Sequence, residues 1–160
     1  MKVRHIIFAT ALAAIASGAF AQGQLNFQNI AQKEVTVRDE ATGEVTTQLE
    51  NADLVKPGET VVFTSIFTNI SDETAENIQV NNPVPGNMVY VAFSARGESA
   101  TVSYSVDGTD FGAPNSLSVV GEDGTERTAR PEEYKEIRWV IDTELAPGES
   151  GEVSFKARLL

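Results

Sequence analysis

The 160-residue chain contains no cysteine, and its single histidine, His5, lies near the start. After His5 the chain therefore cannot build a Ser-His-Asp or Cys-His nucleophile, or a zinc site with His and Cys ligands. Haem ligation through His or Cys and iron–sulfur clusters are excluded for the same reason. Without disulfides, a folded domain must be held by burial of its core. Chemistry based on carboxylates, lysine or tyrosine is what the composition leaves open.

Long apolar runs are also scarce, and the clearest one covers residues 6–15. It follows a short basic segment, residues 1–5, and precedes the small-x-small tripeptide Ala19-Phe20-Ala21. This order is typical of a secretory signal. The run is shorter than the roughly 20 apolar residues that a membrane-spanning helix needs. We therefore predict that residues 1–21 are a signal peptide cleaved between Ala21 and Gln22. The protein is then exported, to the periplasm or to the extracellular or cell-surface space, with no membrane span in its mature form.

Positive charge is in short supply. Residues 1–21 hold two cations and no carboxylate, which leaves 10 cations and 23 carboxylates in residues 22–160, a net charge of −13. Such a chain is repelled by nucleic-acid phosphates and by anionic lipid. We expect no nucleic-acid partner. The charge favours divalent cations or basic partners, and the partner class that we predict is a protein or a component of the cell envelope.

No segment of ten or more residues in the mature chain has a convincing helical stripe of apolar side chains. Short alternating runs are separated instead by clusters of Gly, Pro, Asn and Asp, which is typical of an all-β sandwich. We predict an immunoglobulin-like antiparallel β-sandwich of roughly seven to nine strands. The candidate strands are residues 25–30, 34–38, 44–49, 61–68, 77–80, 88–93, 100–106, 137–141 and 152–159, with 117–120 as a further short candidate. Phe63, Phe67, Trp139 and Phe155 are expected to meet between the two sheets.

Turn chemistry marks several connections between these runs. Ala41-Thr42-Gly43 is expected to close a hairpin. Pro57-Gly58 and Pro147-Gly148 each precede a strand, and both fit a type II turn in which Gly takes the positive φ. Residues 121–133 are polar and charged, and we expect them to form a long exposed loop.

Six blocks of turn and strand residues follow one another along the second part of the chain: residues 55–63, 68–80, 82–91, 104–108, 137–139 and 145–155. In this order they resemble the DUF11 conserved-repeat domain of bacterial and archaeal secreted and surface proteins. The resemblance covers roughly residues 54–160 and implies an immunoglobulin-like sandwich with no catalytic residues. Because this chain holds a single copy, a stalk role does not follow from it. Residues 22–53 lie outside the resemblance and are expected to add strands at the sheet edge or to form an extension.

Asp107 and Asp110 flank Gly108 in a short acidic segment. A hairpin turn explains this segment without a ligand. The alternative is a calcium site, with Glu122 and Asp123 as possible additional ligands, because Ca²⁺ prefers oxygen ligands on loops. The spacing of a calcium-binding loop is absent. No other cofactor is predicted.

Three further features have a structural and a functional interpretation. Trp139 lies in an alternating strand, which favours a core aromatic over a sugar-stacking platform. Asn69-Ile70-Ser71 matches a glycosylation acceptor but fits a turn after a strand. Residues 81–86 hold two prolines and form either a stiff crossover or a binding loop.

Paired carboxylates of the glycosidase kind are the enzymatic route that the composition leaves. Glu122-Asp123 and Glu132-Glu133 lie in a polar segment with no apolar surroundings to raise a pKa, which an acid catalyst requires. We predict no catalytic residues and no enzyme activity. The sequence instead favours an exported structural or protein-interaction domain, with a calcium-binding or carbohydrate-binding module as the alternative.

Overall fold

The computed structural model describes residues 24–160, so the predicted cleavage site between Ala21 and Gln22 lies outside the described residues. The described part is all-β, which confirms the predicted fold class. It contains eleven strands and one short 3₁₀ helix, more strands than the seven to nine expected. They are β1 (Leu25–Arg38), β2 (Val45–Asn51), β3 (Thr60–Asn69), β4 (Gln79–Pro83), β5 (Met88–Tyr90), β6 (Arg96–Gly97), β7 (Ala100–Ser105), β8 (Ser118–Val120), β9 (Glu126–Thr128), η1 (Pro131–Glu133), β10 (Glu136–Ile141) and β11 (Ser150–Leu159).

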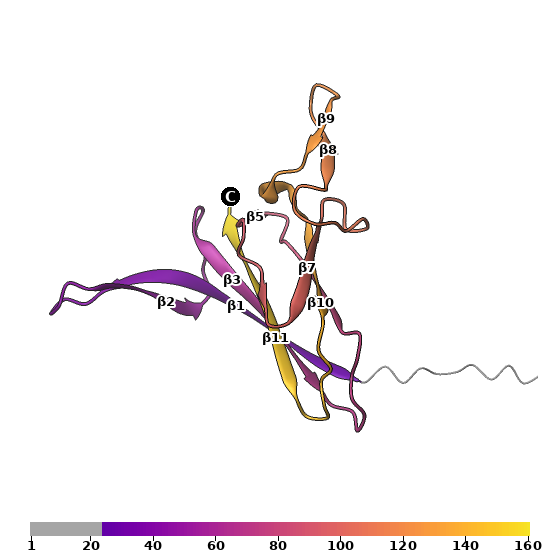
Figure 1. Ribbon diagram of the computed structural model, residues 1–160. Coiled ribbons are helices and arrows are strands. Elements are labelled where there is room, and N and C mark those ends of the chain that lie inside the picture. The colour runs from indigo at the N-terminus through magenta and orange to yellow at the C-terminus, as the bar shows by residue number, and fades with distance from the viewer. Residues whose placement is uncertain (1–23) are drawn as a thin grey trace, which may run out of the picture.

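Two antiparallel sheets form an immunoglobulin-like sandwich (Figure 1). The large sheet has the order β2-β1-β3-β11-β5, and the two-residue β6 also pairs with β11. The small sheet has the order β4-β10-β7. A separate hairpin, β8–β9, projects from the top of the view in Figure 1.

The core lies between the two sheets because the inward positions of β3, β10 and β11 alternate with outward ones. Phe67 and Phe155 from the large sheet and Trp139 from the small sheet are almost fully buried. Phe63 is partly exposed, and its ring stacks on Phe155 with the centroids 5.1 Å apart. These four aromatic side chains were the expected core of the sandwich, and all four belong to it.

Ser65 occupies an inward position of β3 that would suit an apolar side chain. Its hydroxyl donates to the Asn29 Oδ1 at 2.7 Å, and it accepts a hydrogen bond from the Asn82 Nδ2 at 2.9 Å. Asn29 lies on β1 and Asn82 on β4, so Ser65 links the two sheets along one side of the sandwich. A buried hydroxyl with these partners pays no large desolvation penalty.

The two Pro-Gly turns have the predicted geometry. Gly58 and Gly148 have φ values of 88° and 80°, the left-handed region that glycine adopts without steric cost. In each turn the following glutamate also reaches back, and Glu59 and Glu149 accept the backbone N–H three residues earlier at 2.8 Å. The same local sequence therefore builds the same turn before β3 and before β11.

The prediction of one exposed loop over residues 121–133 was wrong. The segment contains β9 and η1, and between them Ala129 is buried, with only 4% of its surface exposed. The Ala129 N–H donates to the Leu117 carbonyl at 2.8 Å, which ties the segment to the body. No sequence pattern indicated this strand, because β9 is exposed along its whole length and therefore has no alternating apolar side chains. β9 and the two-residue β6 were the strands that the sequence pattern did not indicate.

Candidate interaction surface

β1 is longer than its partner in the body of the sheet. Its first part, as far as Lys33, pairs with β3, while Gln32–Arg38 pairs with β2. The second part therefore leaves the sandwich with β2 as a two-stranded ribbon, which extends away from the body in Figure 1. We call residues 32–51 the arm. Both strands of the arm lie within residues 22–53.

The arm exposes apolar side chains. All seven residues of β2 are exposed, including Val45 at 60% and Leu49 at 48%. Val37 on the facing strand is also exposed. An isolated two-stranded ribbon is marginally stable in water, and exposed apolar side chains on such a ribbon are typical of a contact surface.

Local hydrogen bonds nevertheless fix the shape of the arm. At its tip, the Asp39 Oδ1 accepts the backbone N–H groups of Ala41 and Thr42, both at 2.8 Å. These bonds hold the pKa of Asp39 below its ordinary value. At its base, the Lys156 ammonium on β11 forms an ion pair with Glu34. The turn at the tip is therefore fixed by its own hydrogen bonds, and the base of the arm is tied to β11.

The outer edge of β2 has no neighbouring strand among the described residues. The Asp39 N–H donates to the Glu44 carbonyl at the tip, and the Ala52 N–H donates to the Ala31 carbonyl at the base. Antiparallel pairs alternate between hydrogen-bonded and non-hydrogen-bonded, so these two bonds set the alternation along β2. Backbone groups of Thr46, Gln48 and Glu50 face β1. Those of the other four residues point outward: Val45, Thr47, Leu49 and Asn51.

The surroundings of this free edge are acidic. Residues 44–53 contain Glu44, Glu50 and Asp53 and no cation. On β1, Arg38 lies opposite Val45, and the Lys33 ammonium donates to the Leu54 carbonyl at 3.3 Å. The edge therefore offers backbone donors and acceptors next to three carboxylates, of which Glu50 lies opposite Lys33.

The acidic turn at residues 107–110 has a complete hydrogen-bonding scheme of its own. The Asp107 Oδ1 accepts from the Thr109 N–H at 2.8 Å, the Asp110 N–H at 3.0 Å and the Ser105 hydroxyl at 2.9 Å. The two backbone bonds are the main reason that the pKa of Asp107 lies well below its ordinary value. Asp107 therefore organises its own turn.

The other two calcium candidates lie in the β8–β9 turn, where the Asp123 Oδ1 accepts from the hydroxyl of Thr125 at 2.7 Å. Within residues 24–160, no three His, Cys, Asp or Glu side chains come together in a way that could hold a metal ion. The structure thus does not bring Asp107 and Asp110 into one cluster with Glu122 and Asp123. Calcium binding by these residues stays a prediction that a titration would test.

Two other residues singled out from the sequence have structural roles. Trp139 is fully buried in the core and cannot offer an exposed stacking platform. Asn69 is fully buried, and its Nδ2 donates to the carbonyls of Glu73 and Leu145 at 2.7 and 2.8 Å. The Asn69 Oδ1 accepts the Ser71 hydroxyl at 2.7 Å, so the 69–71 segment is a turn. In the segment 81–86, residues 81–83 belong to β4 and pair with β10, so the expectation of a connecting segment was wrong for them. Val84 after the strand is buried.

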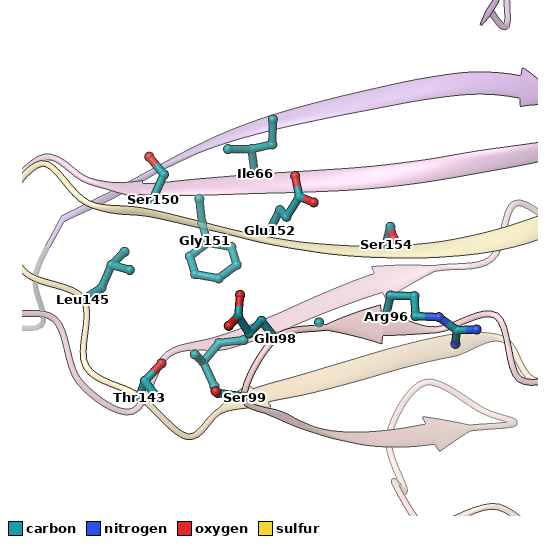
Figure 2. A pocket seen from close by; sticks show the side chains of 13 residues that line it. Ile66, Arg96, Glu98, Ser99, Thr143, Leu145, Ser150, Gly151, Glu152 and Ser154 are labelled. Carbon is teal, nitrogen blue, oxygen red and sulfur yellow. The ribbon is translucent and has the colours of Figure 1, made fainter. Parts of the chain in front are cut away.

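A cleft of about 620 Å³ opens between β11, the β6–β7 turn and the β10–β11 loop (Figure 2). Glu98 comes from the turn and Glu152 from β11, and Arg96 lies at one end. The ring of Phe67 packs against Gly151, where a Cβ atom would lie 2.5 Å from the ring. Phe67 is itself buried, so the wall of this cleft offers polar groups and aliphatic side chains such as Ile66 but no exposed aromatic face.

The free edge of β2 is the functional feature that the sequence did not identify. Residues 44–49 were correctly predicted as a strand, but not as one without an outer neighbour. The available signal was composition, because only Val45 and Leu49 are apolar among the seven residues of β2, too few to cover a core.

In residues 24–160 no helix is long and apolar enough to cross a membrane. Comparison of the chain with protein-family models, with curated proteins and with solved structures finds no significant match.

Proposed function

We propose that this chain is an exported, non-catalytic protein-interaction domain that binds an extended segment of a partner by adding it as a strand to the outer edge of β2. The observation that carries the proposal is the seven-residue strand at the edge of the large sheet, exposed on both faces and unpaired on one side. Strand addition uses such edges because the backbone hydrogen bonds give affinity and the alternating side chains give specificity.

Natural proteins usually protect exposed edge strands with charged side chains, bulges, prolines or a covering loop. Along Val45–Asn51, β2 has one charged side chain, Glu50, and none of the other devices, and its edge is presented by an arm with a hydrogen-bonded tip. Preorganisation of this kind lowers the entropic cost of binding. The arrangement supports a docking edge over an accidental one.

Export and family membership are part of the same proposal. The signal-like segment, residues 1–21, supports export. The order of turn and strand blocks supports a relation to the DUF11 conserved-repeat domain, for which no catalytic role is implied. Such a domain fits an adaptor in the periplasm or outside the cell.

The substitution Thr47→Pro tests the proposal, because the Thr47 N–H points outward and takes no part in the ladder to β1. Proline at this position removes one edge donor and obstructs pairing, and edge strands tolerate it. We expect the far-ultraviolet dichroism and melting temperature to stay near those of the wild type. Partners recovered from the exported protein fraction should be lost.

Thr47→Val is the matched control, since it keeps the N–H and a β-branched side chain. Partners retained by Thr47→Val and lost by Thr47→Pro would support strand addition. Equal recovery by both variants would refute it.

A further inference from the structure

We infer that the segment bound at β2 is a basic strand of another protein, in which apolar residues alternate with Lys or Arg. The inference rests on the proposed strand addition and names the chemistry of its partner. It follows from the distribution of charge and apolar surface over the two faces of the arm.

One face of β2 is apolar and disfavours a cation. Val45, Thr47 and Leu49 share this face, because side chains alternate along a strand. Cross-strand partners lie on the same side of a ribbon, which places Arg38 on this face beside Val45 and Glu34 beside Leu49. The charge of Glu34 is already compensated by Lys156. A partner side chain entering here gains most by being apolar, since Val45 and Leu49 are about half exposed.

The opposite face and the ends of the strand favour a cation. Thr46, Gln48 and Glu50 project on this face, where they lie opposite Val37, Val35 and Lys33. Lys33 is a single cation near the three carboxylates Glu44, Glu50 and Asp53, so the local charge stays negative. Glu44 and Asp53 flank the strand, so Lys or Arg in alternate positions of a partner would meet carboxylates. Opposite charges across a strand pair stabilise it, and like charges opposite each other destabilise it.

A second copy of this chain is a poorer occupant of the same edge. Two β2 strands side by side would bring together two stretches of residues 44–53, each with three carboxylates and no cation. The net charge of −13 on the mature chain adds long-range repulsion. Charge therefore favours a basic partner and opposes pairing between copies.

Four seven-residue synthetic peptides test the inference with the intact domain. One alternates Lys and Val, one has the same composition with the alternation scrambled, one alternates Glu and Val, and one alternates Ser and Val. We expect the Lys–Val peptide to bind more tightly than the other three. We also expect its affinity to fall as salt rises.

The domain variant Glu44→Gln/Glu50→Gln should weaken Lys–Val binding roughly 2- to 30-fold, the range for two exposed ion pairs. The matched control is Glu122→Gln/Glu132→Gln, which removes the same charge from exposed sites in the β8–β9 turn and on η1. It should leave the affinity unchanged.

The outcomes separate the partner chemistry from the binding mode. If the Ser–Val or Glu–Val peptide binds as tightly as Lys–Val and Thr47→Pro abolishes that binding, the proposed function stands and this inference is wrong. If neither Thr47→Pro nor scrambling of the peptide changes the affinity for the Lys–Val sequence, strand addition itself is wrong. A dimer of the domain that Thr47→Pro dissociates would also overturn the inference, because the edge would then serve a second copy.

Discussion

At the scale of single residues, Asn69 shows how one polar side chain organises a corner of the sandwich. It ends β3, and its amide bridges the carbonyls of Glu73 and Leu145, which belong to two different loops. The Asn69 N–H and carbonyl also bond to Glu149 and Gly148. A fully buried amide is stable only when its donors and acceptor are satisfied, as they are here.

Replacing Asn69 with Ala should lower the free energy of unfolding by about 1–3 kcal/mol, because buried carbonyls lose their donor. Chemical denaturation would measure this change. Ser71→Ala is the control, and it should cost less than about 1 kcal/mol because Ser71 is only partly buried and water can replace its hydroxyl. A smaller effect at Asn69 than at Ser71 would contradict this account of the corner.

At the scale of elements, the β8–β9 hairpin is tied to η1 by a two-pronged ion pair. Both terminal nitrogens of Arg127 donate to Glu133, at 2.7 and 2.6 Å. The Arg130 N–H also donates to Glu133, at 2.8 Å. The pKa of Glu133 is lowered to about 2, mainly by the hydrogen bonds from Arg127 and next by the bond from the Arg130 N–H. A carboxylate with a lowered pKa stabilises the folded state above its unfolded pKa, and this contribution is lost as pH falls.

We therefore expect the hairpin tether to hold at neutral pH and to weaken as the pH falls from about 4.5 towards 2. Arg127→Met should raise the pKa of Glu133 part of the way to its ordinary value, since the Arg130 N–H remains. A carbon-detected NMR titration of the Glu133 carboxyl would measure both values. Arg158→Met on β11 is the control and should leave this pKa unchanged. An unaltered pKa in Arg127→Met would show that the ion pair is not the main cause.

The projection of the arm from the body of the domain depends on more than the sequence of the arm itself. Its strands and its turn were predicted from alternation and from Ala41-Thr42-Gly43. Its projection from the body arises because β1 continues for several residues after β3 has ended. That difference in length is a property of the assembled sheet, and a local pattern does not contain it.

At the scale of the whole molecule, alternation in β3, β10 and β11 predicted both the fold class and the core aromatics. The reason is that burial between two sheets imposes period two on the sequence. β6 and β9 were missed because two or three residues are too few to show a period, and β9 buries nothing. From the sequence, Ser65 is an interruption of the apolar face of β3. The structure explains it, because its hydroxyl bonds to Asn29 and Asn82.

The difference between local sequence patterns and three-dimensional arrangement also explains which sites the sequence could indicate. The composition excluded chemistry that depends on His or Cys, because that argument needs no coordinates. The acidic turn at Asp107 was interpreted correctly as a turn, since Asp followed by Gly sets local geometry. The free edge of β2 is defined by the absence of a neighbouring strand among residues 24–160, and only the three-dimensional arrangement shows it.

Amide hydrogen exchange on the arm tests strand addition most directly, because β2 carries its own internal reference. The N–H groups of Thr46, Gln48 and Glu50 bond to β1 and should exchange slowly with or without a partner. Those of Val45, Thr47, Leu49 and Asn51 should exchange fast in the free domain and become protected when the Lys–Val peptide is bound. Peptide binding that leaves these four amides exchanging fast would contradict the central claim.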